Sequence, residues 1–205
     1  MVLIAGGVST GVIILAIIIY YLVLKSDKYT SVLCEPTHFK DKFNMFISNN
    51  KLPLSQKGNQ FSYSLHIKFQ NVAESSQWYT NVNYKKPILY RFGSPNINYY
   101  PKEHNLQIQM AYKDQAGDID YYNIDINTLP IQKWFSLIIV LNNRYIDIFI
   151  DGQRYISTHL PNVPFIFNRN LYLGESDNNF NGYVDKVKYF NYSLSEEEIG
   201  RGIYV

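Results

Sequence analysis

Large apolar residues alternate with polar ones along much of this 205-residue chain. They occupy every odd position between 61 and 69, and every even position between 106 and 112. Successive side chains of a β-strand point to opposite faces, so a period of two indicates strands with one buried face. The alternation therefore predicts antiparallel strands with one buried face each.

Further strands and turns follow the same pattern. The pair Asp151-Gly152 separates two alternating runs and predicts a tight hairpin turn. After residue 25, the one convincing helix start is at the C-terminus, where Ser195 and Glu198 have the spacing of a capping box. The 19 Tyr and 12 Phe suit pleated, half-buried surfaces. These features predict an all-β fold, an antiparallel jelly-roll β-sandwich.

The N-terminus differs from the rest of the chain, because no charged residue occurs between Val2 and Leu24. About 20 apolar residues suffice for a helix to cross a bilayer, so we expect one N-terminal transmembrane helix. A cleaved signal peptide fits less well, since the apolar run is long and lacks a basic region before it. The anchor positions that we single out are Val2, Ile4, Gly7, Gly11, Ile14, Ile18 and Leu22.

The sequence divides into three parts: an anchor at 1–25, a membrane-proximal segment with a first strand at 26–60, and the jelly-roll domain at 61–205. Lys25 and Lys28 follow the apolar run, and the positive-inside rule places such residues on the cytosolic side. Cys34, the only cysteine, cannot form an internal disulfide. We therefore expect a single-pass membrane protein with its domain on the cytosolic side.

The C-terminal third resembles a known family. The segments that carry the resemblance are Trp134-Phe-Ser-Leu, Ile148-Phe-Ile-Asp-Gly152, Leu171-Tyr-Leu-Gly174, Phe180-Asn-Gly-Tyr-Val-Asp185 and Leu194-Ser-Glu-Glu-Glu-Ile199. Their order is similar to that of laminin G-like, or concanavalin A-like, jelly rolls. The resemblance implies a fold rather than a function. In structural terms we expect Trp134 in the core, Gly152 and Gly182 at special backbone angles, and Asp185 bonded to a nearby backbone or to Lys186 or Arg201.

The sequence contains no pattern that predicts catalysis. Glycan hydrolases need two carboxylates at a fixed separation, and no Glu-x-Asp-x-Glu string occurs. The four histidines lack the spacing of metal ligands. Asp118 and Asp120 are weak candidates for calcium, and solvated turn acids are the alternative. We therefore expect no enzymatic activity and no cofactor, with calcium as the one alternative.

Aromatic residues in polar segments are the candidate binding residues. We expect Trp78 and Tyr79 in a polar loop at 73–86, and Tyr99 and Tyr100 in the loop after Pro95. Large rings stack on sugars and also anchor protein interfaces. The expected partners are thus protein or glycan, besides the lipid bilayer.

The net charge is only +2 and the basic residues form no stripe, so the sequence gives no electrostatic sign of nucleic-acid binding.

The main prediction is a non-enzymatic, membrane-anchored interaction protein. A virion component of a large DNA virus, a minor capsid or virion membrane protein linking an inner membrane to the capsid shell, fits this description. The alternative is a membrane-anchored surface lectin that binds glycans.

Overall fold

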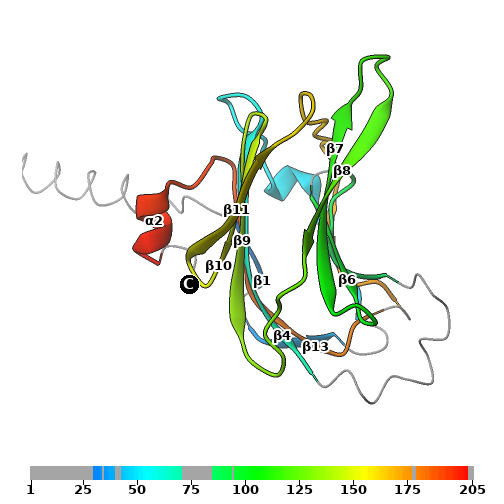
Figure 1. Ribbon diagram of the computed structural model, residues 1–205, viewed down its shortest axis with the longest axis vertical. Coiled ribbons are helices and arrows are strands. Elements are labelled where there is room, and N and C mark those ends of the chain that lie inside the picture. Colours follow the sequence, from blue (N-terminus) through cyan, green and yellow to red (C-terminus); the bar gives the residue numbers. More distant parts are fainter. Residues whose placement is uncertain are drawn as a thin grey trace, which may run out of the picture.

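The computed structural model describes residues 30–33, 35–39, 43–70, 85–93, 95–176 and 179–202. These residues form two antiparallel sheets that face each other (Figure 1). The predicted all-β sandwich is therefore confirmed. The anchor positions Val2 to Leu22, together with Lys25, Lys28 and Cys34, lie outside the described residues. Within the described stretches, no helix has the length and apolar character needed to span a bilayer.

The first sheet follows the order β1-β13-β4-β9-β10-β11, and β2 pairs with another part of β13. Its strands are β1 (Thr30–Leu33), β2 (Thr37–Phe39), β4 (Gln60–Phe69), β9 (Phe135–Asn142), β10 (Tyr145–Ile150), β11 (Gln153–His159) and β13 (Gly182–Phe190). The hairpin predicted at Asp151-Gly152 joins β10 to β11. Both turn residues have positive φ, +50° and +76°, as a type I′ turn requires.

The second sheet follows the order β3-β12-β5-β6-β7-β8. Its strands are β3 (Met45–Ile47), β5 (Lys86–Tyr90), β6 (Asn96–Tyr100), β7 (Asn105–Lys113), β8 (Ile119–Ile126) and β12 (Leu171–Leu173). The strand expected within 43–47 is β3, and a short 3₁₀ helix, η1 (Asn49–Lys51), follows it. Segment 26–60 thus contributes strands to both sheets, where the sequence indicated a single first strand.

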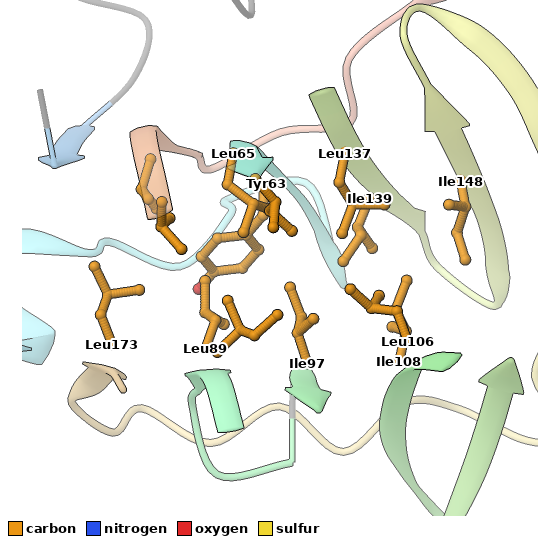
Figure 2. Packing of buried hydrophobic residues seen from close by; sticks show 14 of the residues in the cluster. Tyr63, Leu65, Leu89, Ile97, Leu106, Ile108, Leu137, Ile139, Ile148 and Leu173 are labelled. Carbon is orange, nitrogen blue, oxygen red and sulfur yellow. The ribbon is translucent and has the colours of Figure 1, made fainter. Parts of the chain in front are cut away.

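The core lies between the two sheets. Figure 2 shows Leu65, Leu137 and Ile139 of the first sheet pointing toward Ile97 and Ile108 of the second. Leu65 and Ile108 are apolar positions of the predicted alternating runs. The period of two therefore sets which face of each strand is buried.

A buried arginine crosses this core. Arg91, which directly follows β5, is 1 % exposed. Its guanidinium donates from Nη1 to the Tyr63 hydroxyl at 3.1 Å and from Nη2 to the Leu52 carbonyl at 3.1 Å. It also lies 5.2 Å from the centre of the Tyr189 ring. Arg91 thus joins the second sheet to two tyrosines of the first.

The C-terminal segment covers part of the outer face of the first sheet. Helix α2 (Glu196–Gly200) lies on the side of that sheet away from the second sheet (Figure 1). The predicted capping box between Ser195 and Glu198 is present. Leu194 and Ile199 belong to a second apolar cluster. Its other buried members, which lie on strands of the first sheet, are Ile138, Val140, Phe149 and Phe190.

Two structural expectations need correction. Trp134 is not in the core: it is 37 % exposed, with its ring 6.2 Å from that of Tyr183. Trp134 directly precedes Phe135, which is 2 % exposed and faces the core, so the pleat turns Trp134 outward. Gly182 does not need a positive φ; a Cβ there would instead collide with the Lys68 carbonyl and the Phe180 ring.

Candidate functional site

A continuous series of aromatic rings, which we call the aromatic ladder, begins on the outer face of the second sheet and ends on the segment between β11 and β12. Its members are Phe46, Tyr172, Tyr90, Phe92, Phe167 and Phe165, in spatial order. The first three steps between ring centres measure 6.4, 6.4 and 6.5 Å, and the last two measure 4.5 and 4.1 Å. Phe46 is 65 % exposed, and Tyr172, Tyr90 and Phe92 are each exposed by more than a third.

Strand register explains why these rings lie together. Tyr172 of β12 is the direct partner of Phe46 on β3 and of Tyr90 on β5. Leu171 and Leu173, on either side of Tyr172, are fully buried. Directly paired residues of antiparallel strands share a face, so three rings from three strands point outward side by side.

The same cross-strand row continues as three amides. Tyr90 pairs with Asn96 on β6, Asn96 pairs with Gln109 on β7, and Gln109 pairs with Asn123 on β8. Asn96 Nδ2 donates to Gln109 Oε1 at 3.2 Å, and Gln109 Nε2 donates to Asn123 Oδ1 at 3.0 Å. We call Asn96, Gln109 and Asn123 the amide relay. Its two hydrogen bonds run in the same direction.

One end of the amide relay lacks a partner. Asn96 is 6 % exposed, and its Oδ1 accepts no hydrogen bond among the described residues. A buried acceptor without a donor is costly, and such groups in native structures call for an explanation. Asn96 on β6 is the cross-strand partner of Tyr90 on β5. This acceptor therefore lies where the aromatic ladder and the amide relay meet.

A second polar row lies beside the amide relay. The Tyr100 hydroxyl donates to Gln107 Oε1 at 3.2 Å, and Gln107 Nε2 donates to Asp125 Oδ1 at 3.1 Å. Asn105 Nδ2 also donates to that carboxylate oxygen, at 3.1 Å. These bonds hold the polar side chains of β6, β7 and β8 in fixed orientations beside the aromatic ladder.

The tyrosines of this face influence one another. Partial burial raises the pKa of the Tyr90 hydroxyl, and the nearby phenols of Tyr121 and Tyr172 raise it further. The Tyr90 hydroxyl therefore keeps its proton at neutral pH. It can donate one hydrogen bond and accept others.

The structure places the sequence-predicted aromatic residues differently. Trp78 and Tyr79 lie outside the described residues. Tyr99 and Tyr100 lie in strand β6, so their assignment to a loop is wrong. Tyr99 is 3 % exposed and stacks on Phe69 in the core, with ring centres 4.2 Å apart, whereas Tyr100 belongs to the outer polar row. The Pro95 turn simply ends earlier than the sequence indicated, and the alternation resumes at Asn96.

The acidic hairpin tip contains Asp118 and Asp120. Asp114 Oδ1 accepts the backbone N–H of Asp118 at 2.8 Å, and Asp120 Oδ2 accepts the Tyr112 hydroxyl at 2.6 Å. The Tyr112 hydroxyl, followed by the backbone N–H of Tyr121, lowers the pKa of the Asp120 carboxyl. In the described part of the chain, no three His, Cys, Asp or Glu side chains are grouped to hold a metal ion. The calcium prediction gains no support at this tip.

One juxtaposition was invisible in the sequence: Asp185, His66 and Ser136 are cross-strand partners on β13, β4 and β9. They do not form the hydrogen bonds of a catalytic triad. His66 Nε2 and Ser136 Oγ are both buried without a partner, and Asp185 Oδ1 accepts the backbone N–H of Lys186 at 2.7 Å. The last bond agrees with the expected backbone role of Asp185. The buried Ser136 Oγ is also out of reach of a substrate.

A shallow hollow of about 520 Å³ lies elsewhere, at the start of β4 and the end of β13. It is lined by Ser55, Gln56, Lys57, Gln60, Asn191, Tyr192 and Ser193. The Tyr192 hydroxyl donates to Glu198 Oε1 at 3.2 Å, and burial together with Glu198 raises the pKa of Tyr192 to about 12. These lining residues include one aromatic side chain, Tyr192, so they form no series of exposed rings like the aromatic ladder.

Comparison with known proteins agrees with this architecture. The sequence profile of the concanavalin A-like lectin/glucanases superfamily matches residues 44–200. The chain belongs to this family. The predicted laminin G-like resemblance is therefore confirmed, and it extends well beyond the C-terminal third. A search of curated protein sequences finds no match.

Among solved structures, the domain is similar to the binding domain of botulinum neurotoxin serotype D. The TM-score is 0.62 at 17 % identity, covering 82 % of this chain and 41 % of the toxin chain. Two binding domains of botulinum neurotoxin DC are also similar. One is in complex with SialylT (TM-score 0.56, 13 % identity, 87 % and 51 % covered), the other with rat synaptotagmin II (0.55, 12 %, 85 % and 51 %).

The family domain thus spans about half of each toxin chain, and at these identities the likeness concerns the fold alone.

Proposed function

We propose that this protein is a non-catalytic lectin whose binding site is the outer face of the second sheet. The observation that carries the proposal is the single cross-strand row in which Phe46, Tyr172 and Tyr90 continue into the amide relay. Sugar rings present C–H faces that pack on aromatic rings, and hydroxyls that pair with amides. The row offers both surfaces side by side.

The unpaired acceptor Asn96 Oδ1 supports the same proposal. Asn96 Oδ1 lacks a donor. A sugar whose ring stacks on the neighbouring Tyr90 ring can supply one from a hydroxyl group. Because Oδ1 is buried, we expect the Tyr90 side chain to shift when the ligand enters. The polar row of Tyr100, Gln107 and Asp125 lies beside the amide relay on the same face, and we expect it to line one side of the bound ligand.

The experiment is a glycan array probed with the full chain. The protein is held in a detergent without a sugar headgroup, because residues 2–24 are apolar and a glycoside detergent would compete. Tyr90→Ala and Tyr172→Ala should each weaken binding roughly tenfold or more. Tyr155→Ala is the matched control, since Tyr155 is an exposed tyrosine on β11 of the other sheet. Equal binding by all three variants would refute the site.

A protein partner is the second candidate, favoured by the exposure of Phe46 and the apolar character of the aromatic ladder. Exposed aromatic rings are common at protein interfaces. In this case the domain is the interaction module of a membrane-anchored virion component, tying an inner membrane to the capsid shell. Loss of a co-purifying partner in Tyr172→Ala, with no glycan binding by the unaltered protein, would favour this function.

Membrane topology also separates the two candidates. Lys25 and Lys28 favour a domain on the cytosolic side, which suits the protein-contact function, whereas a surface lectin has its domain outside the cell. Protease added to sealed microsomes should digest a cytosolic domain. Protection of the domain would assign it to the lumenal side and support the lectin.

A further inference from the structure

The charge pattern of the proposed site restricts its ligand further. The row from Phe46 to Asn123 consists of three aromatic rings and three amides and contains no Asp, Glu, Lys, Arg or His. The neighbouring register position carries a carboxylate, Asp125, which is exposed and accepts hydrogen bonds from Gln107 and Asn105. A ligand that lies across the amide relay thus meets neutral amides and one negative charge.

Two cations near this row, Arg91 and Lys113, are directed elsewhere. Arg91 follows β5 directly, but its guanidinium points into the core and is held there by Tyr63 and Leu52. Lys113 stands on β7 beyond the amide relay, and its Nζ lies 4.9 Å from the centre of the Phe165 ring. Recognition of a sugar carboxylate depends on a cation or on several converging donors. Neither is provided by the described residues of the amide relay.

The unpaired acceptor does not suit a carboxylate. Asn96 Oδ1 requires a donor, so the ligand group placed against it is a sugar hydroxyl or an N-acetyl amide and not a carboxylate. The two relay bonds also run away from Asn96, so the amide relay cannot supply that donor without reversing.

We infer that the site selects neutral glycans and rejects sialylated ones. The inference rests on the proposed lectin function. It differs from what the related toxin structure with SialylT shows for that protein. It also identifies Asp125 as a specificity-determining residue, which sets the charge of the face.

The test uses matched pairs of glycans on one array, each a neutral oligosaccharide and the same oligosaccharide with a terminal sialic acid. We expect the neutral members to bind. Their sialylated forms should bind more weakly, by roughly tenfold or more, since like charges oppose association. The difference should shrink in 0.5 M salt, because salt screens exposed charges. A merely structural role of Asp125 would not produce this salt dependence.

A charge series at position 125 sharpens the test. Asp125→Asn should raise the relative binding of sialylated glycans, and Asp125→Lys should raise it further. Asp118→Asn, at the exposed hairpin tip, is the matched control and should leave the ratio unchanged. Circular dichroism and thermal melting establish that each variant is folded.

The outcomes separate the two proposals. Preferential binding of sialylated glycans, weakened by Tyr90→Ala, would overturn the inference while supporting the lectin. Equal binding of both members, unchanged across the charge series, would do the same. No binding of any glycan by the folded protein would overturn the proposed function itself, and the inference with it.

Discussion

Asn96 and Gln109 are direct partners on β6 and β7, and Asn96 Nδ2 donates to Gln109 Oε1 at 3.2 Å. This bond orients both amides on the outer face. It leaves Asn96 Oδ1 as the free end of the amide relay. The aromatic ladder and the amide relay are therefore joined at the boundary between β5 and β6.

The first prediction concerns Gln109. Gln109→Leu removes one donor and one acceptor from the amide relay, leaving Asn96 Nδ2 and Asn123 Oδ1 without their partners. We expect glycan binding to fall about tenfold, while the free energy of unfolding falls by only about 1 kcal/mol, because the side chain is half-exposed. Gln115→Leu, at the exposed hairpin tip, should change neither quantity. Calorimetric titration and urea unfolding measure the two effects.

The second prediction concerns the arginine in the core. Arg91→Ala leaves the Leu52 carbonyl and the Tyr63 hydroxyl without their donor and opens a cavity beside Tyr189. We expect a loss of about 3 kcal/mol or more in the free energy of unfolding. Arg169→Ala is the control, because that side chain is exposed and only its backbone carbonyl bonds to Arg91. Equal unfolding midpoints for both variants would contradict the role assigned to Arg91.

The third prediction concerns a glycine in β13. Gly182→Ala places a methyl group against the Lys68 carbonyl and the buried Phe180 ring. Since the carbonyl is part of the sheet and cannot move aside, we expect a loss of about 2–4 kcal/mol in unfolding free energy. Gly200→Ala, whose added methyl meets no atom, should be neutral or stabilise by about 0.5–1 kcal/mol at the end of α2. The order of the two melting temperatures checks the prediction.

The fourth prediction concerns pH. Burial lowers the pKa of His66, Lys186 lowers it further, Asp185 opposes this, and smaller effects come from Lys188 and Asp151. The unfolded chain therefore binds a proton more readily than the folded one. Stability should fall as pH drops below about 6.5, the ordinary histidine value, and level off below the folded pKa.

The measurement is the urea midpoint between pH 7.5 and 5.0. His66→Gln should reduce the loss on acidification, because glutamine does not titrate. His159→Gln, on the exposed edge strand β11, serves as the control and should retain it. A loss that is identical in all three proteins would show that other groups cause it.

Much of the sandwich could be predicted from the chain itself. The alternation over β4 and β7 indicates which side chains face the core, and the Asp151-Gly152 turn and the Ser195 capping box are local signals. Local signals of this kind depend on residues a few positions apart, so they survive any change of partner strand.

The candidate site could not be predicted in the same way. Tyr172, Tyr90, Asn96 and Gln109 come from separate parts of the sequence, and only the strand order and register bring them into one row. The outward direction of Tyr172 could be predicted from Leu171 and Leu173 on either side of it. The residues that lie beside Tyr172 on neighbouring strands could not be predicted. Trp134 was expected in the core, but its position directly before the core-facing Phe135 directs it outward.

The central claim is that ligand binds where the aromatic ladder meets the amide relay. Its most direct test follows the side-chain amide resonances of Asn96, Gln109 and Asn123 by ¹H–¹⁵N NMR, while a neutral glycan that binds on the array is titrated into the full chain. We expect saturable shifts in these three amides and none in Gln56 or Asn191, which line the hollow at the start of β4. Shifts confined to Gln56 and Asn191, with the amide relay unmoved, would contradict it.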